Sequence, residues 1–259
     1  MRFLWSYGWD QHYYRMIGTL FDPAFTGILS ILTWLVLFSL KKKLPQWLLW
    51  TTSTGLLLAV LLTYSRASYL SAAVLALLII GYKIARESII SRNRLLIIVV
   101  LVSSVLGFLI APKPGGEGVN LLRTETIYAR LNTARAALKA MSGTEWLVGN
   151  GLFSESIFSS SDTQTTTATH ARMPDNIFIT LLTQTGIIGL LLACGIAIRA
   201  ISSLMRTDAE LAFAWIVVLV HSQFNNSLLQ PFVLLYLLLF MMSYGFKVTT
   251  RSILDSLPA

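Results

Sequence analysis

The residues best suited to chemistry lie just before a long apolar run in the second half of the chain. They are His170, Arg172, Asp175 and Asn176. A carboxylate or an imidazole can take the proton of an attacking hydroxyl, so Asp175 is a candidate catalytic base and His170 an alternative. Partial burial would raise the pKa of Asp175 toward a useful range. Asn176 would orient an acceptor, with Arg172 beside it. Because Pro174 favours a helix start, Asp175 or Asn176 could equally serve only as an N-cap.

Arginines form a second group of candidates, because a guanidinium stays charged and binds phosphate oxygens in a bidentate manner. Arg66 stands where one apolar run ends and the next begins. This arginine and the N-terminus of the following helix could together hold an anion. Its charge opposes the helix dipole there, so local helix stability does not explain it. Arg15 precedes the first apolar run and is either a substrate contact or a snorkelling side chain at the membrane interface.

Residues 123–141 predict an amphipathic helix, because apolar side chains recur along one stripe at about 100° per residue. The stripe consists of Ile127, Leu131, Ala134, Leu138 and Met141. The arginines that bracket the stripe are Arg123, Arg130 and Arg135. They could face a cavity and hold a diphosphate, or they could simply reach lipid headgroups. The Gly149-x-Gly151 pattern that follows is more typical of a turn than of a phosphate-binding loop.

The elements that must position these residues are membrane helices. Of the 259 residues, 55% are hydrophobic and 12% are charged, whereas soluble domains carry about 25% charged residues. A helix needs roughly 20 apolar residues to cross a bilayer. Seven runs approach this length: about 24–40, 47–64, 67–83, 95–111, 177–198, 210–228 and 230–247. The sequence therefore predicts an all-α, polytopic helix bundle that forms a single membrane domain over residues 1–259.

The basic residues predict how the bundle is oriented. They gather in alternate connections between the runs and after the last one: Lys41–Lys43, Lys83–Arg94, Arg199–Arg206 and Lys247–Arg251. The positive-inside rule assigns these connections and the C-terminus to the cytoplasm. The N-terminus and the long segment 112–175 then lie outside the membrane. This extracytoplasmic loop contains the amphipathic helix and most of the candidate site.

Several function classes are disfavoured. The net charge of +8 is explained by topology, and no basic patch is interleaved with aromatics, so nucleic acid is not an expected partner. Cys194 is the sole cysteine, which excludes an internal disulfide. No metal-ligand cluster or cofactor motif is visible. His221 lies inside an apolar run, where an ionisable group either packs against another helix or faces a cavity.

Four loose motifs recur in this order in one family of membrane enzymes. They are Arg15-x-x-Gly18-Thr19-x-x-x-Pro23, Thr63-x-Ser65-Arg66-Ala67, Arg130…Gly149-x-Gly151 and Pro174-Asp175-Asn176…Gly186-x-x-Gly189. On these motifs and their order, the chain resembles the O-antigen ligase and O-antigen polymerase superfamily from about residue 15 to 245. Members usually have more membrane spans, so the chain would correspond to the C-terminal part of one.

The resemblance implies a GT-C-like glycosyltransferase in the bacterial inner membrane that depends on a lipid carrier and needs no metal or other cofactor. Such an enzyme takes a glycan from undecaprenyl pyrophosphate at the outer face of the membrane. It transfers the glycan to an acceptor hydroxyl, either on another lipid-linked repeat (polymerase) or on lipid A core (ligase). The arginines identified above would hold the pyrophosphate.

One departure from the family pattern bears on the choice between these reactions. The ligase-like pattern has a histidine where this chain has Asp175, which favours a polymerase. A transporter is an alternative of another class, but it would need charged or broken helices at the midplane. The spans here are expected to be uninterrupted, and the charges gather at the outer face. An inactive, truncated fragment is a third alternative because the chain is short.

Overall fold

The computed structural model describes residues 14–41, 43–86, 119–121, 125–152 and 174–242. Every regular element of these residues is helical, which confirms the all-α prediction. The longer helices are α2 (Pro23–Ser39), α3 (Gln46–Leu62), α4 (Arg66–Arg86), α6 (Glu125–Lys139), α8 (Ile177–Thr207) and α9 (Ala209–Asn225). The short ones are η1 (Gly18–Leu20), α7 (Glu145–Val148) and η5 (Ser227–Leu229). A final apolar helix covers Pro231–Met242.

Six of the seven predicted apolar runs coincide with helices, and the run at 95–111 lies outside the described residues. Among the helices of the described residues, α8 is long and apolar enough to cross a membrane by itself. The helices α2 and α3 have 17 residues each, which corresponds to about 25 Å at 1.5 Å per residue. The hydrocarbon core of a bilayer is about 30 Å thick. The number of crossings therefore stays a prediction.

Local sequence explains where two of these helices begin. Pro23 opens α2, and Asp22 caps it by accepting hydrogen bonds from the backbone nitrogens of Ala24 at 2.6 Å and Phe25 at 3.0 Å. Ser65 caps α4 by accepting from the backbone nitrogen of Ser68 at 3.3 Å. Both caps satisfy backbone donors that the first turn of a helix leaves without a partner.

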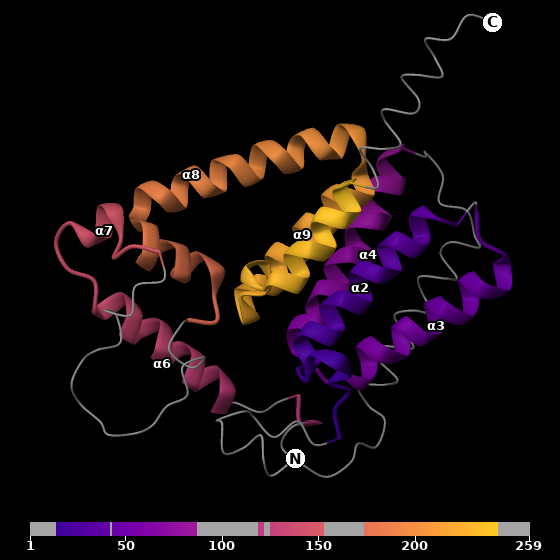
Figure 1. Cartoon of the computed structure of the whole chain (residues 1–259), viewed down its shortest axis with the longest axis horizontal. Coiled ribbons are helices and arrows are strands. Elements are labelled where there is room, and N and C mark those ends of the chain that lie inside the picture. Colours follow the sequence, from indigo (N-terminus) through magenta and orange to yellow (C-terminus); the bar gives the residue numbers. More distant parts are fainter. Residues whose placement is uncertain (1–13, 42, 87–118, 122–124, 153–173, 243–259) are drawn as a thin grey trace, which may run out of the picture.

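The core lies where α2, α4, α9 and the final helix meet. Figure 1 shows α2, α3, α4 and α9 on one side of the molecule, α6 and α7 on the other, and α8 reaching across from α7 to α9. The large side chains at the centre are apolar and fully buried: Ile28, Leu32, Leu35, Leu211, Val217, Val218, Val233 and Leu237. The helices α2 and α4 approach closely at one point, because a Cβ atom added to Gly27 would overlap the side chain of Ser68.

The structure corrects the expectation of uninterrupted spans, because α8 is broken at Gly186. This glycine has φ 65° and ψ −175°, outside the helical region. The break leaves the carbonyl groups of Thr183 and Gln184 without their helical donors. They accept instead from the backbone nitrogens of Asn150 and Gly151, each at 3.0 Å. The Gly149-x-Gly151 turn thus serves as a backbone contact to α8, in line with the turn interpretation of that motif.

The predicted amphipathic stripe is confirmed only in part. Its C-terminal end is buried at Met141, beside Ala137. Near its N-terminal end, Ile127 and Leu131 are each 44% exposed. A helix whose apolar side chains remain exposed at one end suits a position along a membrane surface.

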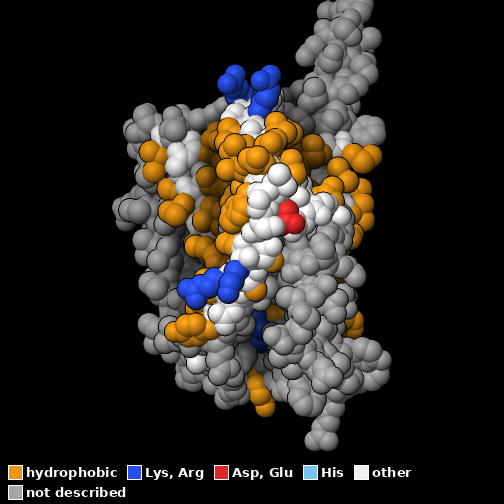
Figure 2. All heavy atoms as spheres, turned by 90° about the vertical axis from the view of Figure 1, so that its left-hand side faces the viewer, with side chains coloured by type: hydrophobic (Ala, Val, Ile, Leu, Met, Phe, Trp, Pro, Cys, Tyr) orange, Lys and Arg blue, Asp and Glu red, His pale blue; other side chains and the backbone are white. Residues whose placement is uncertain are grey.

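The longer, C-terminal part of α8 presents apolar side chains on its outer surface. The exposed residues are Ile187, Ile188, Leu191, Leu192, Ile196 and Ile198. Figure 2 shows hydrophobic side chains gathered over the middle of this side of the molecule, with Lys and Arg side chains above and below them. An apolar band bounded by basic residues is the surface expected of a helix that faces lipid.

Candidate active site

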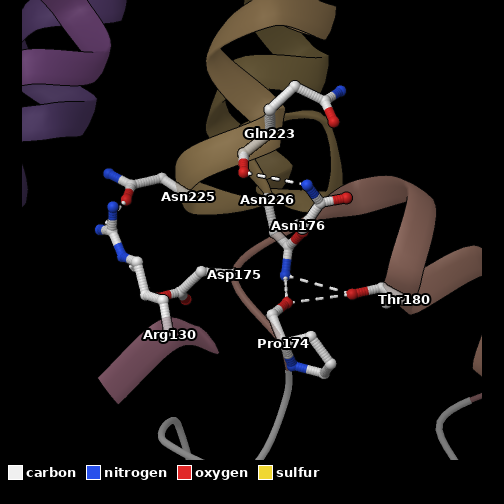
Figure 3. A network of polar contacts seen from close by, with 8 residues as sticks. All are labelled: Arg130, Pro174, Asp175, Asn176, Thr180, Gln223, Asn225 and Asn226. Carbon is white, nitrogen blue, oxygen red and sulfur yellow. Dashed lines mark hydrogen bonds and ion pairs between the residues drawn. The ribbon is translucent and has the colours of Figure 1, made fainter. Parts of the chain in front are cut away.

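The candidate site forms where α6, the segment before α8 and the end of α9 converge. Arg130 of α6 is at its centre (Figure 3). Its Nε donates to Oδ2 of Asp175 at 3.1 Å, and its Nη2 donates to Oδ1 of Asn225 at 2.7 Å. The side chains of Arg130 and Asp175 are 39% and 48% exposed. A cation and a carboxylate are therefore held together where a substrate can reach both of them.

Asp175 is partly buried, and it is paired with a cation. About half of its side chain is exposed, and its partner is the Arg130 guanidinium. A charged partner within hydrogen-bond distance stabilises the carboxylate form. The exposed carboxylate of Asp175 could therefore accept a proton. It would accept one more readily when the Arg130 guanidinium binds another anion in place of Asp175.

Asn176 has a structural role in which both polar atoms of its side chain take part. Its Oδ1 accepts from the backbone nitrogens of Phe178 and Ile179 at 3.0 and 3.2 Å, which caps α8. Its Nδ2 donates to the carbonyl oxygen of Gln223 at 3.2 Å, which ties the cap to α9. The N-cap alternative is confirmed for Asn176 and not for Asp175. An additional role for Asn176 in orienting the acceptor stays a prediction.

A buried amide fixes the segment that carries Asp175. Asn226 adopts a left-handed conformation, with φ 47°, and its Nδ2 donates to the carbonyl oxygen of Pro174 and to Oγ1 of Thr180. The Thr180 hydroxyl donates to the same Pro174 carbonyl at 3.0 Å (Figure 3). Two donors on one carbonyl hold the backbone immediately before Asp175.

Arg66 is the first residue of α4, before the apolar stretch of that helix. Its Nη1 donates to the carbonyl oxygen of Leu121 at 3.4 Å. Burial, and after it the positive charge of Arg130, lowers the pKa of Arg66 from its ordinary value. Because an arginine pKa is so high to begin with, the guanidinium remains charged at neutral pH. Arg66 of α4 and Arg130 of α6 are therefore close enough for their positive charges to act on each other.

The remaining predicted arginines are distributed differently. Arg15 donates from Nε to the carbonyl oxygen of Thr63 at 2.8 Å, and from Nη2 to that of Tyr64 at 3.5 Å. These contacts satisfy carbonyls at the end of α3 and give Arg15 a structural role, so its assignment to substrate stays a prediction. Arg135 is exposed on α6, and five residues of helix turn it about 140° away from Arg130. Arg123, His170 and Arg172 lie outside the described residues.

Asn225 and Asn226 contact the candidate site, and sequence reasoning did not include them in it. Both mark the outer end of the predicted run at 210–228, but the sequence offered no partner for either. The available signal was two adjacent amides at the end of an apolar run, on the same side of the membrane as Arg66. A pairing between Asn225 and Arg130, 95 residues apart, could not be read from that signal alone.

His221 belongs to a separate, buried cluster on α9. Its Nδ1 lies 2.5 Å from Oγ of Ser227, and its Nε2 lies 3.3 Å from Oγ of Ser68 on α4. All three residues are fully buried. Both ring nitrogens thus have hydroxyl partners, which supports the helix-packing interpretation of this histidine. The described residues contain no group of three His, Cys, Asp or Glu side chains that could hold a metal ion.

A comparison with protein families supplies the final observation. The family model described as O-antigen ligase matches residues 51–194, which is more than half of the chain. The match includes most of α3, all of α4, α6 and α7, and most of α8. It also includes Arg66, Arg130 and Asp175. Comparisons with curated proteins and with solved structures found no match. The resemblance seen in the sequence is thereby confirmed, and the chain belongs to the O-antigen ligase family of membrane proteins.

Proposed function

We propose that this protein is a membrane glycosyltransferase that moves glycans from undecaprenyl pyrophosphate to an acceptor hydroxyl at the outer face of the inner membrane. Membership of the O-antigen ligase family supports the general activity. The observation that carries the specific proposal is the position of Arg130, which contacts Asp175 and Asn225 while its charge also acts on Arg66. A cation paired with an accessible carboxylate, and a second cation close enough to act on the first, suit a reaction that expels a diphosphate and removes a hydroxyl proton.

The acceptor hydroxyl oxygen attacks the anomeric carbon of the carrier-linked sugar. A new glycosidic C–O bond forms while the bond from that carbon to the pyrophosphate oxygen breaks. The pyrophosphate leaves with the bonding electron pair, and the hydroxyl proton passes to the Asp175 carboxylate. Arg130 and Arg66 stabilise the charge that develops on the leaving group. They accelerate the reaction because they act more strongly on the transition state than on the bound substrate.

The ion pair between Arg130 and Asp175 makes donor binding precede proton removal. Pyrophosphate oxygens compete with the carboxylate for the Arg130 guanidinium, since both are anions that bind its fork. When the pyrophosphate occupies Arg130, Asp175 loses part of the charge that stabilises its ionised form and becomes a better proton acceptor. Asn225 keeps the guanidinium in place during the exchange, because its amide oxygen accepts from a different nitrogen, Nη2.

Within this activity we favour polymerisation of O-antigen or exopolysaccharide repeat units over transfer to lipid A core. The reason is Asp175, which stands where the ligase-like pattern has a histidine. The donor is an undecaprenyl-pyrophosphate-linked oligosaccharide in either case, and the acceptor glycan alone distinguishes the two reactions. Analysis of whether the product is a longer lipid-linked chain or a lipid A conjugate separates them.

The deciding experiment replaces Asp175→Asn in cells that lack the wild-type gene. Surface polysaccharide is then resolved as a length ladder on a gel, with the amount of protein in the membrane measured in parallel. The matched control is Asp208→Asn. Asp208 accepts from the backbone nitrogen of Leu211 at 3.1 Å and caps α9, and an asparagine caps a helix equally well.

We expect the ladder to be lost with Asp175→Asn and retained with Asp208→Asn at equal protein levels. A normal ladder from Asp175→Asn would remove Asp175 as the base and leave His170 as the candidate. Absence of a ladder even with the wild-type chain would overturn the proposed polymerase activity of this chain.

Transport of a lipid-linked glycan is a second candidate function, and the break in α8 favours it. Discontinuous helices often form binding sites in transporters, because the break exposes backbone carbonyls. Here the carbonyls of Thr183 and Gln184 are already occupied by the amides of Asn150 and Gly151, which argues against an ion site at the break. A transporter moves a labelled substrate across vesicles and leaves its glycosidic linkages unchanged, whereas the proposed enzyme creates a new linkage.

A further inference from the structure

Two glycines from distant parts of the chain form a backbone-to-backbone contact beside the candidate site. We call this contact, made by residues 147–151 and 183–186, the glycine clasp. Gly149 follows α7 with φ 74°, and Gly186 breaks α8 with φ 65°. Both conformations lie in the left-handed region, where a side chain is disfavoured. The clasp therefore requires glycine at both positions on conformational grounds alone.

Close approach adds a second requirement. A Cβ atom on Gly149 would overlap the backbone of Gln184 and Thr185, and one on Gly186 would overlap the backbone at Leu147 and Val148. Backbone atoms cannot rotate away as a flexible side chain can. A single methyl group at either glycine must therefore push the two segments apart.

The clasp also completes the hydrogen bonding of the broken helix. At Gly186 the first part of α8 ends, and its last carbonyls need donors from elsewhere. The amides of Asn150 and Gly151 supply them, at 3.0 Å to the carbonyls of Thr183 and Gln184. Both residues that carry these carbonyls, Thr183 and Gln184, are buried. The turn after α7 is thus the C-terminal cap of the first part of α8.

The two segments joined by the clasp are those that carry the central ion pair. Arg130 is on α6, which leads through a few residues into α7 and Gly149. Asp175 directly precedes α8, whose first part leads to Gly186. We infer that the glycine clasp is a positioning device for the glycosyl transfer proposed above: it holds α6 against the first part of α8 so that Arg130 meets Asp175 in reactive geometry.

This inference rests on the proposed function for its kinetic consequence, but its structural consequence can be measured independently. Gly149→Ala and Gly186→Ala are the test variants. Gly195→Ala, in the same helix, is the matched control because a Cβ atom there meets nothing within 4 Å. Gly143→Ala is a second control, since its φ of 46° is also left-handed but its Cβ would enter open space and it lies outside the clasp. Comparison with Gly143→Ala separates close approach from backbone strain.

The first readout is a distance. Cys194 is the sole cysteine, so Cys194→Ser provides a background for two spin labels. One label replaces Tyr128, an exposed residue of α6, and the other replaces Leu62, an exposed residue at the end of α3. The distance distribution between the labels in detergent or nanodiscs reports how firmly α6 is held against the rest of the molecule.

We expect Gly149→Ala and Gly186→Ala to broaden or shift this distribution, and Gly195→Ala to leave it unchanged. Turnover of a labelled undecaprenyl-pyrophosphate oligosaccharide should fall about 10- to 100-fold in the two clasp variants, as expected when reacting groups are displaced by about 1 Å. Their KM for the donor should change less than kcat. Gly143→Ala should lie close to wild type in both measurements.

The outcomes separate this inference from the proposed function. Unchanged distances in both clasp variants would overturn the inference, whatever the activity. Changed distances with undiminished turnover, in a protein whose wild type is active, would also overturn it. An inactive wild type with broadened distances in the variants would overturn the proposed function and leave the clasp as the element that positions Arg130.

Hydrogen exchange in the unsubstituted protein gives an answer even if neither alanine variant accumulates in the membrane. The amides of Asn150 and Gly151 should exchange at least about tenfold more slowly than unstructured amides, because each donates to a carbonyl of α8. Gly151 is itself exposed, so burial would not explain its protection. Exchange at the unstructured rate for both amides would overturn the inference without any substitution.

Discussion

Two polar clusters share the C-terminal end of α9 and differ in how much solvent reaches them. The inner cluster joins His221 to Ser68 and Ser227, all fully buried. The outer cluster joins Arg130 to Asp175 and Asn225, and its charged side chains are 39% and 48% exposed. Neutral groups that satisfy one another inside the protein stabilise a single arrangement of helices. Charged groups that remain accessible can exchange their partners for a substrate.

The inner cluster also helps to orient the outer one. His221 and Asn225 are four residues apart on α9, so their side chains lie on neighbouring turns of one face. The contact between His221 and Ser68 fixes how α9 is rotated against α4. That rotation directs Asn225 toward Arg130. The comparison therefore predicts large effects on activity from the outer cluster and large effects on stability from the inner one.

The largest expected effect is on activity, from Arg130→Ala. Removing one preorganised donor from a developing negative charge typically costs about 10²- to 10³-fold in rate, and we expect a loss of that size in transfer from a labelled lipid-linked donor. Arg130→Lys should restore only part of the rate, because an ammonium cannot reproduce the bidentate fork. The matched control is Lys139→Ala, an exposed cation near the end of the same helix. Activity within about twofold of wild type for Arg130→Ala would show that the outer cluster is not the site.

The next effect is on stability, from His221→Ala. The substitution opens a cavity and leaves the Ser227 hydroxyl without its partner in a buried site. Together these changes should lower the free energy of unfolding by about 2–4 kcal/mol. Thermal unfolding in detergent would measure this as a lower Tm. The control is Gln223→Ala on the same helix, because the Gln223 side chain donates only to the carbonyl oxygen of Leu219, 2.9 Å away within the same helix. Equal Tm values for the two variants would contradict a structural role for the inner cluster.

Much of the fold could be predicted from the sequence because it depends on local chemistry. An apolar run of helical length, a proline at the first position of α2 and a serine before α4 act within a few residues of themselves. The break at Gly186 could not be predicted in this way. A glycine in an apolar run suggests close helix packing, and the donors that complete the break lie about 35 residues earlier, at Asn150 and Gly151.

The candidate site was predictable in composition but not in arrangement. The sequence identified Arg66, Arg130 and Asp175 as charges on one side of the membrane. It could not decide whether Asp175 or Asn176 caps α8, because both residue types are good caps and the choice depends on contacts with α9. It also gave no partner for Asn225, since that pairing depends on how three helices meet.

A smaller loss of stability is expected from a substitution in α2 beside the inner cluster. A methyl group at Gly27 would overlap the Ser68 side chain, which also contacts His221. Overpacking of this kind costs about 1–3 kcal/mol, so Gly27→Ala should lower the Tm. Gly55→Ala in α3 is the control, because its Cβ meets nothing within 4 Å. Alanine favours a helix over glycine by up to about 1 kcal/mol, so this control should leave the Tm unchanged or raise it. A lower Tm in both variants would show that replacing a helix glycine destabilises the protein whether or not it contacts Ser68.

The smallest expected effect is the change in stability caused by Asp175→Asn. It tests whether the outer cluster contributes little to folding. The ion pair with Arg130 is about half exposed, and exposed ion pairs typically contribute about 0–1 kcal/mol. Asp175→Asn should therefore abolish transfer while lowering the free energy of unfolding by less than about 1 kcal/mol, and added salt should reduce even that difference. A loss above about 2 kcal/mol would mean that Asp175 holds α6 in place as firmly as His221 holds α9. The outer cluster would then be structural as well, and the loss of activity could no longer be attributed to a missing base.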